Sequence, residues 1–276
     1  MIHGEWAEAK LAVPYRHSDY MHPPKSSESA FRILQEGIPK FLAIPFLGKA
    51  LQQFDCWVAG GSLIDFVCGR ELEYNDATRA DNEERRDIDL FCTKECLPEI
   101  SRFFNSQGTT DEGIENWKIT SINESERATL YDTGNYLIHL VKITWPSPYD
   151  TINDFDIRAA ACAITKDKVF TIDGALDDIV HQVIKIRDGH IESPGRTFYR
   201  MLKYIHAKKF KADVDEFVRV IEEELLKEKE VEKEINKWEA YELSMKSLVD
   251  NVRQYPILQD VLNEIQKSMF IAERSF

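Results

Sequence analysis

The hydrophobic positions in the first half of the chain change between helical spacing and short apolar runs. Phe31, Leu34, Ile38 and Phe41 recur three or four positions apart, as on one face of a helix. The apolar run FDCWVA ends at two glycines, which is typical of a buried strand. The elements predicted here are a helix over 29–46 interrupted near Pro39, a strand over 54–59, a helix over 62–69 capped by Ser62, a strand over 87–92 and a helix over 97–105.

The second half begins with strand patterns and ends with helical ones. Strands are predicted over 117–122, 136–145 and 169–172, and Pro146 and Pro148 break the strongest of them. The segment 155–164 is predicted to hold the start of another strand. From about residue 193 no strand is evident, and the helical segments are 197–210, 213–239 and 257–271. We predict an α+β fold with an irregular arm over 1–29, a mixed sheet with flanking helices over 30–190, and an all-helical domain over 191–276.

Composition and net charge indicate the cellular compartment and the kinds of partner that we expect for this chain. The 276 residues are 43% apolar and 30% charged, enough for a sizeable core and a well-solvated surface. No apolar run approaches the roughly 20 residues that span a bilayer, and the first ten residues lack the pattern of a secretory signal. The cysteine number is odd, and several cysteines lie in apolar runs, which favours a reducing cytoplasm. The net charge of −13 disfavours general nucleic-acid coating.

Asp87 and Asp89 are the first residues that indicate chemistry. On a strand, side chains at i and i+2 point to the same face, about 7 Å apart along the backbone. Ile88 and Leu90 between and after them are apolar, as in a buried strand. Two such carboxylates suit Mg²⁺, which binds carboxylates together with substrate phosphates. An ordinary pair of acidic residues at the end of a strand remains the alternative, because a DxD pattern alone is not specific.

The glycines upstream add to this pattern. Gly60, Gly61 and Ser62 follow a predicted strand and open a helix, where glycine lets a backbone approach phosphate closely. The order of strand, glycine turn, helix, loop and DxD strand resembles that of polymerase β-like nucleotidyltransferases. Within them, the stretch GGSLIDFVCG over 60–69 resembles the GGxxRDxxxG motif in the head domain of tRNA CCA-adding enzymes and bacterial poly(A) polymerases. It departs from that motif at Ile64, where those enzymes carry Arg, and the loop over 70–86 is longer than usual.

The resemblance also implies a third carboxylate on a later strand. Asp156 is the candidate because apolar residues flank it, and Asp154 is its rival on the same face. The segment from Ser147 to Ile157 resembles small phage-encoded nucleotidyltransferases. The alternative for Asp156 is an edge-strand residue paired with Arg158.

A basic helix is predicted in the otherwise acidic second half. Residues 196–211 hold six Lys and Arg residues and no acidic one. Arg200, Lys203 and Tyr204 resemble the R-x-x-K-Y helix that follows the catalytic sheet in the family. The resemblance implies that Arg200 and Lys203 contact the triphosphate and that Tyr204 lines the nucleotide pocket. The alternative is a basic surface that answers the acidic helix beyond residue 213.

The resemblance implies a reaction as well. Asp87, Asp89 and Asp156 would hold two Mg²⁺ or Mn²⁺ ions, and Gly60, Gly61 and Ser62 would position the phosphates of an NTP such as ATP. The nucleoside monophosphate would pass to a hydroxyl of RNA or tRNA, a protein or a small molecule, with release of pyrophosphate. The pattern fits dehalogenase-type phosphatases less well because Phe91 replaces Thr or Val, and glycosyltransferases less well because they need no glycine turn. A nucleotide-binding pseudoenzyme or scaffold remains the alternative from another class.

Overall fold

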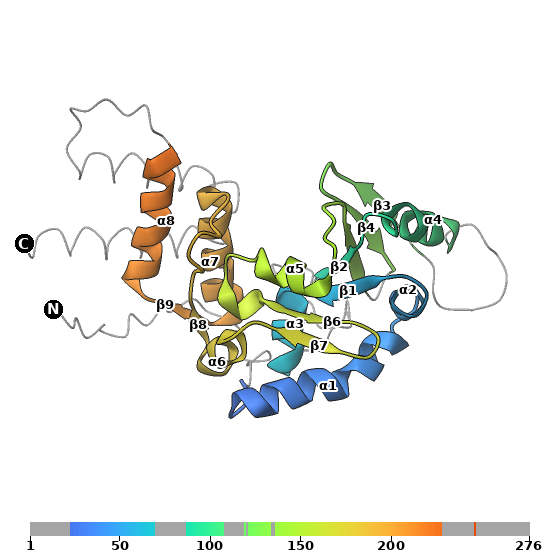
Figure 1. Cartoon of the computed structure of the whole chain (residues 1–276), viewed down its shortest axis with the longest axis horizontal. Coiled ribbons are helices and arrows are strands. Elements are labelled where there is room, and N and C mark those ends of the chain that lie inside the picture. The colour runs from blue at the N-terminus through green and yellow to red at the C-terminus, as the bar shows by residue number, and fades with distance from the viewer. Residues whose placement is uncertain are drawn as a thin grey trace, which may run out of the picture.

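A seven-stranded mixed sheet forms the centre of the molecule (Figure 1). The computed structural model describes residues 23–69, 87–107, 119, 121–133, 136–227 and 246. The strand order is β3-β4-β5-β2-β1-β6-β7; β2 and β5 run parallel, and the other neighbouring pairs are antiparallel. The strands are β1 Cys56–Ala59, β2 Asp87–Cys92, β3 Ser121–Glu124, β4 Ala128–Asp132, β5 Leu137–Val141, β6 Cys162–Ile164 and β7 Val169–Thr171. This arrangement confirms the predicted α+β class.

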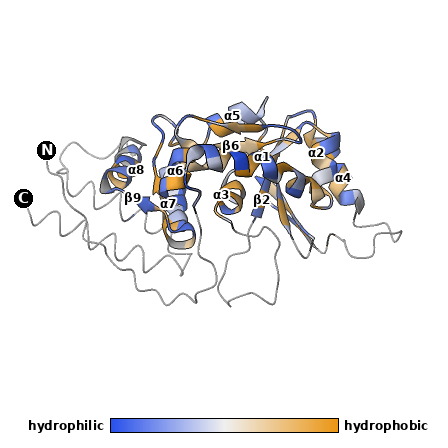
Figure 2. Cartoon of the chain, turned by 90° about the horizontal axis from the view of Figure 1, so that it is seen from below, coloured by the Kyte–Doolittle hydropathy of each residue, from blue (hydrophilic) through white to orange (hydrophobic). Residues whose placement is uncertain are grey.

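Helices pack around this sheet and carry hydrophobic and hydrophilic sides (Figure 2). Helix α5 contacts β1, β6 and β7, whereas α1 packs against α2, α3 and α6. Their bounds are α1 Ser27–Ala43, α2 Leu47–Gln53, α3 Gly61–Val67, α4 Leu97–Gln107, α5 Pro148–Asn153, α6 Ala175–His181, α7 Pro194–Lys208 and α8 Val214–Lys227. No described helix is long and apolar enough to cross a membrane.

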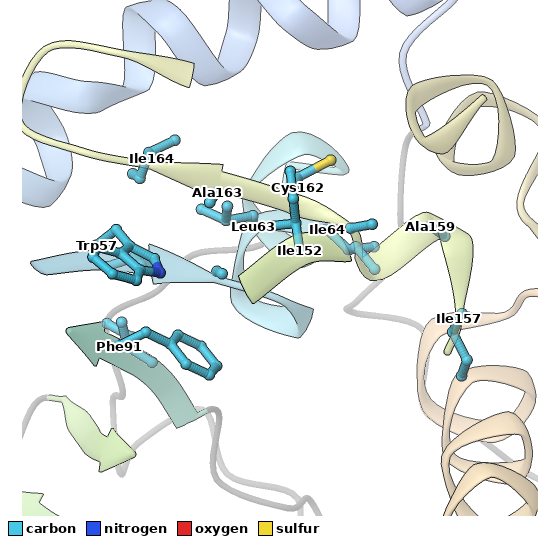
Figure 3. Close-up of a cluster of buried hydrophobic side chains, with 14 of the residues drawn as sticks. Trp57, Leu63, Ile64, Phe91, Ile152, Ile157, Ala159, Cys162, Ala163 and Ile164 are labelled. Carbon is cyan, nitrogen blue, oxygen red and sulfur yellow. The ribbon is translucent and has the colours of Figure 1, made fainter. Parts of the chain in front are cut away.

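The core lies where β1 meets its neighbours (Figure 3). All four residues of β1 are buried, as expected of a central strand that is covered on both faces. Trp57 is fully buried, and its indole N–H donates a 3.0 Å hydrogen bond to the Thr151 hydroxyl on α5. This bond satisfies the one polar atom of a large apolar side chain and holds α5 against the strand.

Several predicted elements differ from those observed. Helix α1 contains Pro39 and continues to Ala43, so the predicted interruption is wrong; Pro39 lies on its exposed side. The segment 155–164 holds a strand, as predicted, but the strand does not begin at Phe155. Only Cys162–Ile164 forms a strand there, and Arg158–Ala160 is a turn of 3₁₀ helix. Helices α2, α5 and α6 were not predicted, because six or seven residues are too few to show a clear helical period. Strand β4 was not predicted either, because it lies in a largely polar stretch of the sequence.

The segment beyond residue 190 is not purely helical. Strand β9, Lys211–Ala212, pairs in parallel with β8, Val183–Ile184. A two-residue ladder leaves no hydrophobic pattern, so the sequence does not reveal it. Helix α7 confirms the predicted helix over 197–210 with small changes at both ends. Most of the predicted arm, the loop over 70–86 and the helical segments beyond 227 lie outside the described residues. The domain boundary near 190 stays a prediction.

Candidate active site

Asp87 and Asp89 lie on one face of β2, as their spacing predicts. Their side chains are 32% and 36% exposed, whereas Ile88 and Leu90 point into the core. The alternation follows from the two-residue period of a strand with one buried face. Two half-exposed carboxylates are thereby held side by side on a rigid element near the middle of the sheet.

His139 lies beside both carboxylates. It is directly opposite Asp89 in the parallel pair of β2 and β5. Its Nδ1 is 3.5 Å from Asp89 Oδ1 and 3.7 Å from Asp87 Oδ2. Burial lowers the pKa of His139, but the hydrogen bond with Asp89 and the charges of both aspartates outweigh burial, and the net pKa is raised. The charge of Lys203 acts against them, which brings the predicted Lys203 into the surroundings of this site.

The turn at Gly60 approaches the same carboxylates. Gly60 has φ +88° and ψ −143°, a conformation that is open almost only to glycine. A Cβ atom added there would lie 3.8 Å from Asp89 Oδ2 and 3.7 Å from the Phe155 ring. The Gly60 N–H donates to the Cys162 carbonyl at 3.2 Å, which fixes the turn to the sheet. The structure thus brings the predicted turn and one predicted carboxylate together.

Ser62 does not cap the helix, so that prediction is wrong. Gly60 takes the N-cap position, and α3 begins at Gly61. Ser62 therefore lies inside the first turn, where it is 3% exposed. Among the residues that the structure describes, its hydroxyl has no hydrogen-bond partner. Leaving a buried polar group unsatisfied costs about 1–3 kcal/mol, so a ligand oxygen that reached this hydroxyl would be favoured.

Asp156 is buried and engaged by helix α7. Its carboxylate accepts hydrogen bonds from the Thr197 hydroxyl and from the Arg200 guanidinium, with which it forms an ion pair. The alternative partner Arg158 instead forms a two-point pair with Asp178, at 2.7 Å for both hydrogen bonds. Asp156 thus has a partner set of its own. Its assignment as a third metal ligand stays a prediction.

Within the described part of the chain, no three His, Cys, Asp or Glu side chains are grouped as a metal site requires. Asp87 and Asp89 are the pair of carboxylates whose chemistry would suit a divalent cation. Both carboxylates are half-exposed and share a face. Hard carboxylate oxygens with room for substrate oxygens are what Mg²⁺ and Mn²⁺ prefer.

One side of α7 carries the residues that contact Asp156, Asp65 and the glycine turn. Thr197, Arg200, Tyr204 and Lys208 are spaced three or four residues apart, which places them on one face of the helix. Tyr204 is buried, and its ring packs edge-to-face on Phe210 with centroids 5.5 Å apart. Burial raises its pKa, and the charges of Asp65, Asp156 and Asp89 act in the same direction. Tyr204 is therefore part of the packing behind the carboxylates, and whether it also lines a nucleotide pocket stays a prediction.

Two residues of this region were not singled out from the sequence. His139 lies in the apolar stretch YLIHLVKITW, and only the pairing of β5 with β2 reveals its neighbours. Lys208 lies in the basic helix, where it was one of six basic residues. A signal did exist for Lys208, because it continues the helical stripe of Arg200 and Tyr204. Its contact with Asp65 spans 143 positions and could not be inferred.

Comparison with known proteins gives only distant structural similarity. No protein-family model and no curated protein matches the sequence. Solved structures similar to this chain include the Thermotoga maritima CCA-adding enzyme complexed with tRNA, at 13% identity and a TM-score of 0.47, with 86% of this chain and 55% of that chain covered. A CCA-adding enzyme with CTP is 12% identical with a TM-score of 0.48, covering 81% of this chain and 54% of the other.

A tRNA nucleotidyltransferase complexed with a primer tRNA and an ATP analogue is 15% identical, with a TM-score of 0.44. The match covers 75% of this chain and 58% of that chain. The chain thus spans little more than half of these proteins. They are named as CCA-adding enzymes or tRNA nucleotidyltransferases, and the motif that the Gly60–Gly69 stretch resembles is also that of CCA-adding enzymes.

Proposed function

We propose that this protein is a metal-dependent nucleotidyltransferase that moves a nucleoside monophosphate from an NTP to an acceptor hydroxyl. The observation that carries the proposal is the approach of Gly60 to Asp89. A turn that only glycine adopts readily lies against a half-exposed carboxylate of the DxD pair, although 29 positions separate them. A glycine turn, which has no side chains of its own to hinder a phosphate, next to paired carboxylates supports the binding of a metal–triphosphate.

The residues of the chain would divide the work as follows. Asp87 and Asp89 would hold the divalent ions, Mg²⁺ or Mn²⁺, which when bound lower the pKa of the acceptor hydroxyl and neutralise charge on the leaving pyrophosphate. Gly60 and Gly61 would let the phosphates approach the backbone, and the buried Ser62 hydroxyl would donate to a phosphate oxygen. Lys203 would add positive charge. The acceptor oxygen forms a bond to the α-phosphorus as the bond to the pyrophosphate oxygen breaks.

Arg200 also has a partner that the sequence did not predict. Its guanidinium is 46% exposed and is paired with Asp156. A guanidinium carries five N–H donors, more than the bond from Nη2 to Asp156 uses. Arg200 would therefore contact the triphosphate while it remains paired with Asp156.

The test is transfer of label from each α-³²P-NTP, with Mg²⁺ or Mn²⁺, into RNA, protein and small-molecule fractions of a lysate. Wild-type protein is expected to label one fraction, and Asp89→Asn is expected to label none. Asp167→Asn is the matched control, because Asp167 is exposed in the turn between β6 and β7, where it accepts a 3.1 Å hydrogen bond from the Thr165 hydroxyl. Labelling by Asp89→Asn at the wild-type rate would overturn the proposal. NTP binding without labelling would favour a nucleotide-binding pseudoenzyme.

A further inference from the structure

Helix α7 ends in a buried cation. Lys208 Nζ lies 2.6 Å from Asp65 Oδ2 on α3, and both side chains are 7% exposed. Taking two charges out of water is costly, and this cost can exceed the attraction between them, whereas removing only one partner leaves an uncompensated buried charge. A buried ion pair is thus weak evidence for stability, and its second contact is the informative one.

That second contact is with the glycine turn. Lys208 Nζ also donates to the Gly61 carbonyl at 3.1 Å. A Cβ atom added to Gly61 would lie 3.7 Å from both Nζ and Cε of Lys208, so the ammonium packs directly against the turn. The Tyr204 ring lies 5.7 Å from the same ammonium and helps to enclose it. The ammonium therefore touches the turn from the side of α7.

The other neighbour of the turn is the DxD strand. Gly60 lies against Asp89, as described above, while Gly61 lies against Lys208. The Gly60–Gly61 turn is thereby held between a carboxylate on β2 and a cation on α7. The conformation at Gly60 is open almost only to glycine, and glycine is the most conformationally free residue, so neighbouring contacts are needed to hold the turn in one position.

We propose that Lys208 is a positioning residue of the candidate active site: with Asp65 it fixes the Gly60–Gly61 turn beside Asp89. The inference rests on the proposed function, because its consequence is a dependence of NTP affinity on Lys208. Lys208 acts through the backbone of the turn and does not touch the reacting atoms. A purely structural role, in which the pair only holds α7 to α3, predicts that NTP affinity follows stability alone.

The experiment separates affinity from stability. In Asp65→Leu/Lys208→Met, apolar side chains replace both charges, and such replacements of buried pairs are often neutral or stabilising. Lys208→Gln is the second variant, because its amide keeps a hydrogen-bond donor without the charge. For each, the melting temperature and the dissociation constant of a non-hydrolysable NTP with Mn²⁺ are measured beside wild type. Lys208→Arg, which keeps a cation next to Asp65, is the conservative control.

The double variant is expected to melt near the wild-type temperature yet to bind NTP about tenfold more weakly, as loss of one charge-assisted contact would cause. Lys208→Gln is expected to show the same loss, and Lys208→Arg to recover most of the affinity. Wild-type affinity in either Lys208→Gln or a folded double variant would overturn the inference and leave the proposed function standing. Failure of the wild-type protein itself to bind any NTP would overturn both.

Discussion

Arg200 of α7 forms an ion pair with Asp156, the residue predicted from the sequence as a third metal ligand. The pair joins the segment after residue 190 to the segment that leads into β6. The Thr197 hydroxyl binds the same carboxylate oxygen, so two residues of one helical face meet one buried acid. Asp156 therefore links α7 to the segment before β6, and any metal ion that it bound would share its carboxylate with Thr197 and Arg200.

The first prediction concerns this pair. Asp156→Asn is expected to lower the free energy of unfolding by about 1–2 kcal/mol, a value at the lower end for charged hydrogen bonds because Arg200 is half-exposed. Equilibrium unfolding in urea measures it, with Asp154→Asn as the control for the same chemical change nearby. Unchanged stability would mean that the pair does not hold α7. Titration with Mn²⁺ on the same variant tests the predicted ligand role separately.

The second prediction concerns Gly60. Gly60→Ala is expected to destabilise the protein by about 1–3 kcal/mol, because the added Cβ would have space but the backbone conformation would be strained. Gly61→Ala is the matched comparison, since Gly61 does not have positive φ and its Cβ would make ordinary contact with Lys208. Thermal unfolding compares the two variants. Equal melting temperatures would contradict the account of the turn.

The third prediction concerns the position at which the chain departs from the GGxxRDxxxG motif. Ile64 is fully buried in the cluster of Figure 3. Ile64→Arg is expected to cost more than about 4 kcal/mol, because it would bury an unpaired charge. Ile64→Val, which removes one methylene, should cost only about 0.5–1.5 kcal/mol. A well-folded Ile64→Arg variant would show that the position has access to solvent or to a partner.

The sequence predicts those parts of the site that depend on one segment alone. Asp87 and Asp89 share a face because side chains alternate along a strand. Gly60 and Gly61 indicate a turn because they lie between a predicted strand and a predicted helix. The basic face of α7 follows from helical spacing in the same way. Each of these depends only on residues a few positions apart, where local geometry dominates.

The parts that the sequence does not predict depend on pairing between distant segments. His139 faces Asp89 only because β5 lies next to β2 in register. Lys208 reaches Asp65 and Arg200 reaches Asp156 only because α7 packs against the sheet domain. The prediction that Ser62 caps the helix is wrong for a local reason. The turn at Gly60 lets α3 begin at Gly61, two residues earlier than a cap at Ser62 would allow.

The most direct test of the site is the dependence of NTP binding on a divalent ion and on the β2 carboxylates. Binding of a fluorescent non-hydrolysable NTP is measured with Mn²⁺, with EDTA, and in Asp87→Asn/Asp89→Asn. The account predicts that wild type binds with Mn²⁺, that EDTA abolishes this binding, and that the double variant, still folded, does not bind with Mn²⁺. Equal binding by wild type and the double variant, or binding that EDTA leaves unchanged, would contradict it.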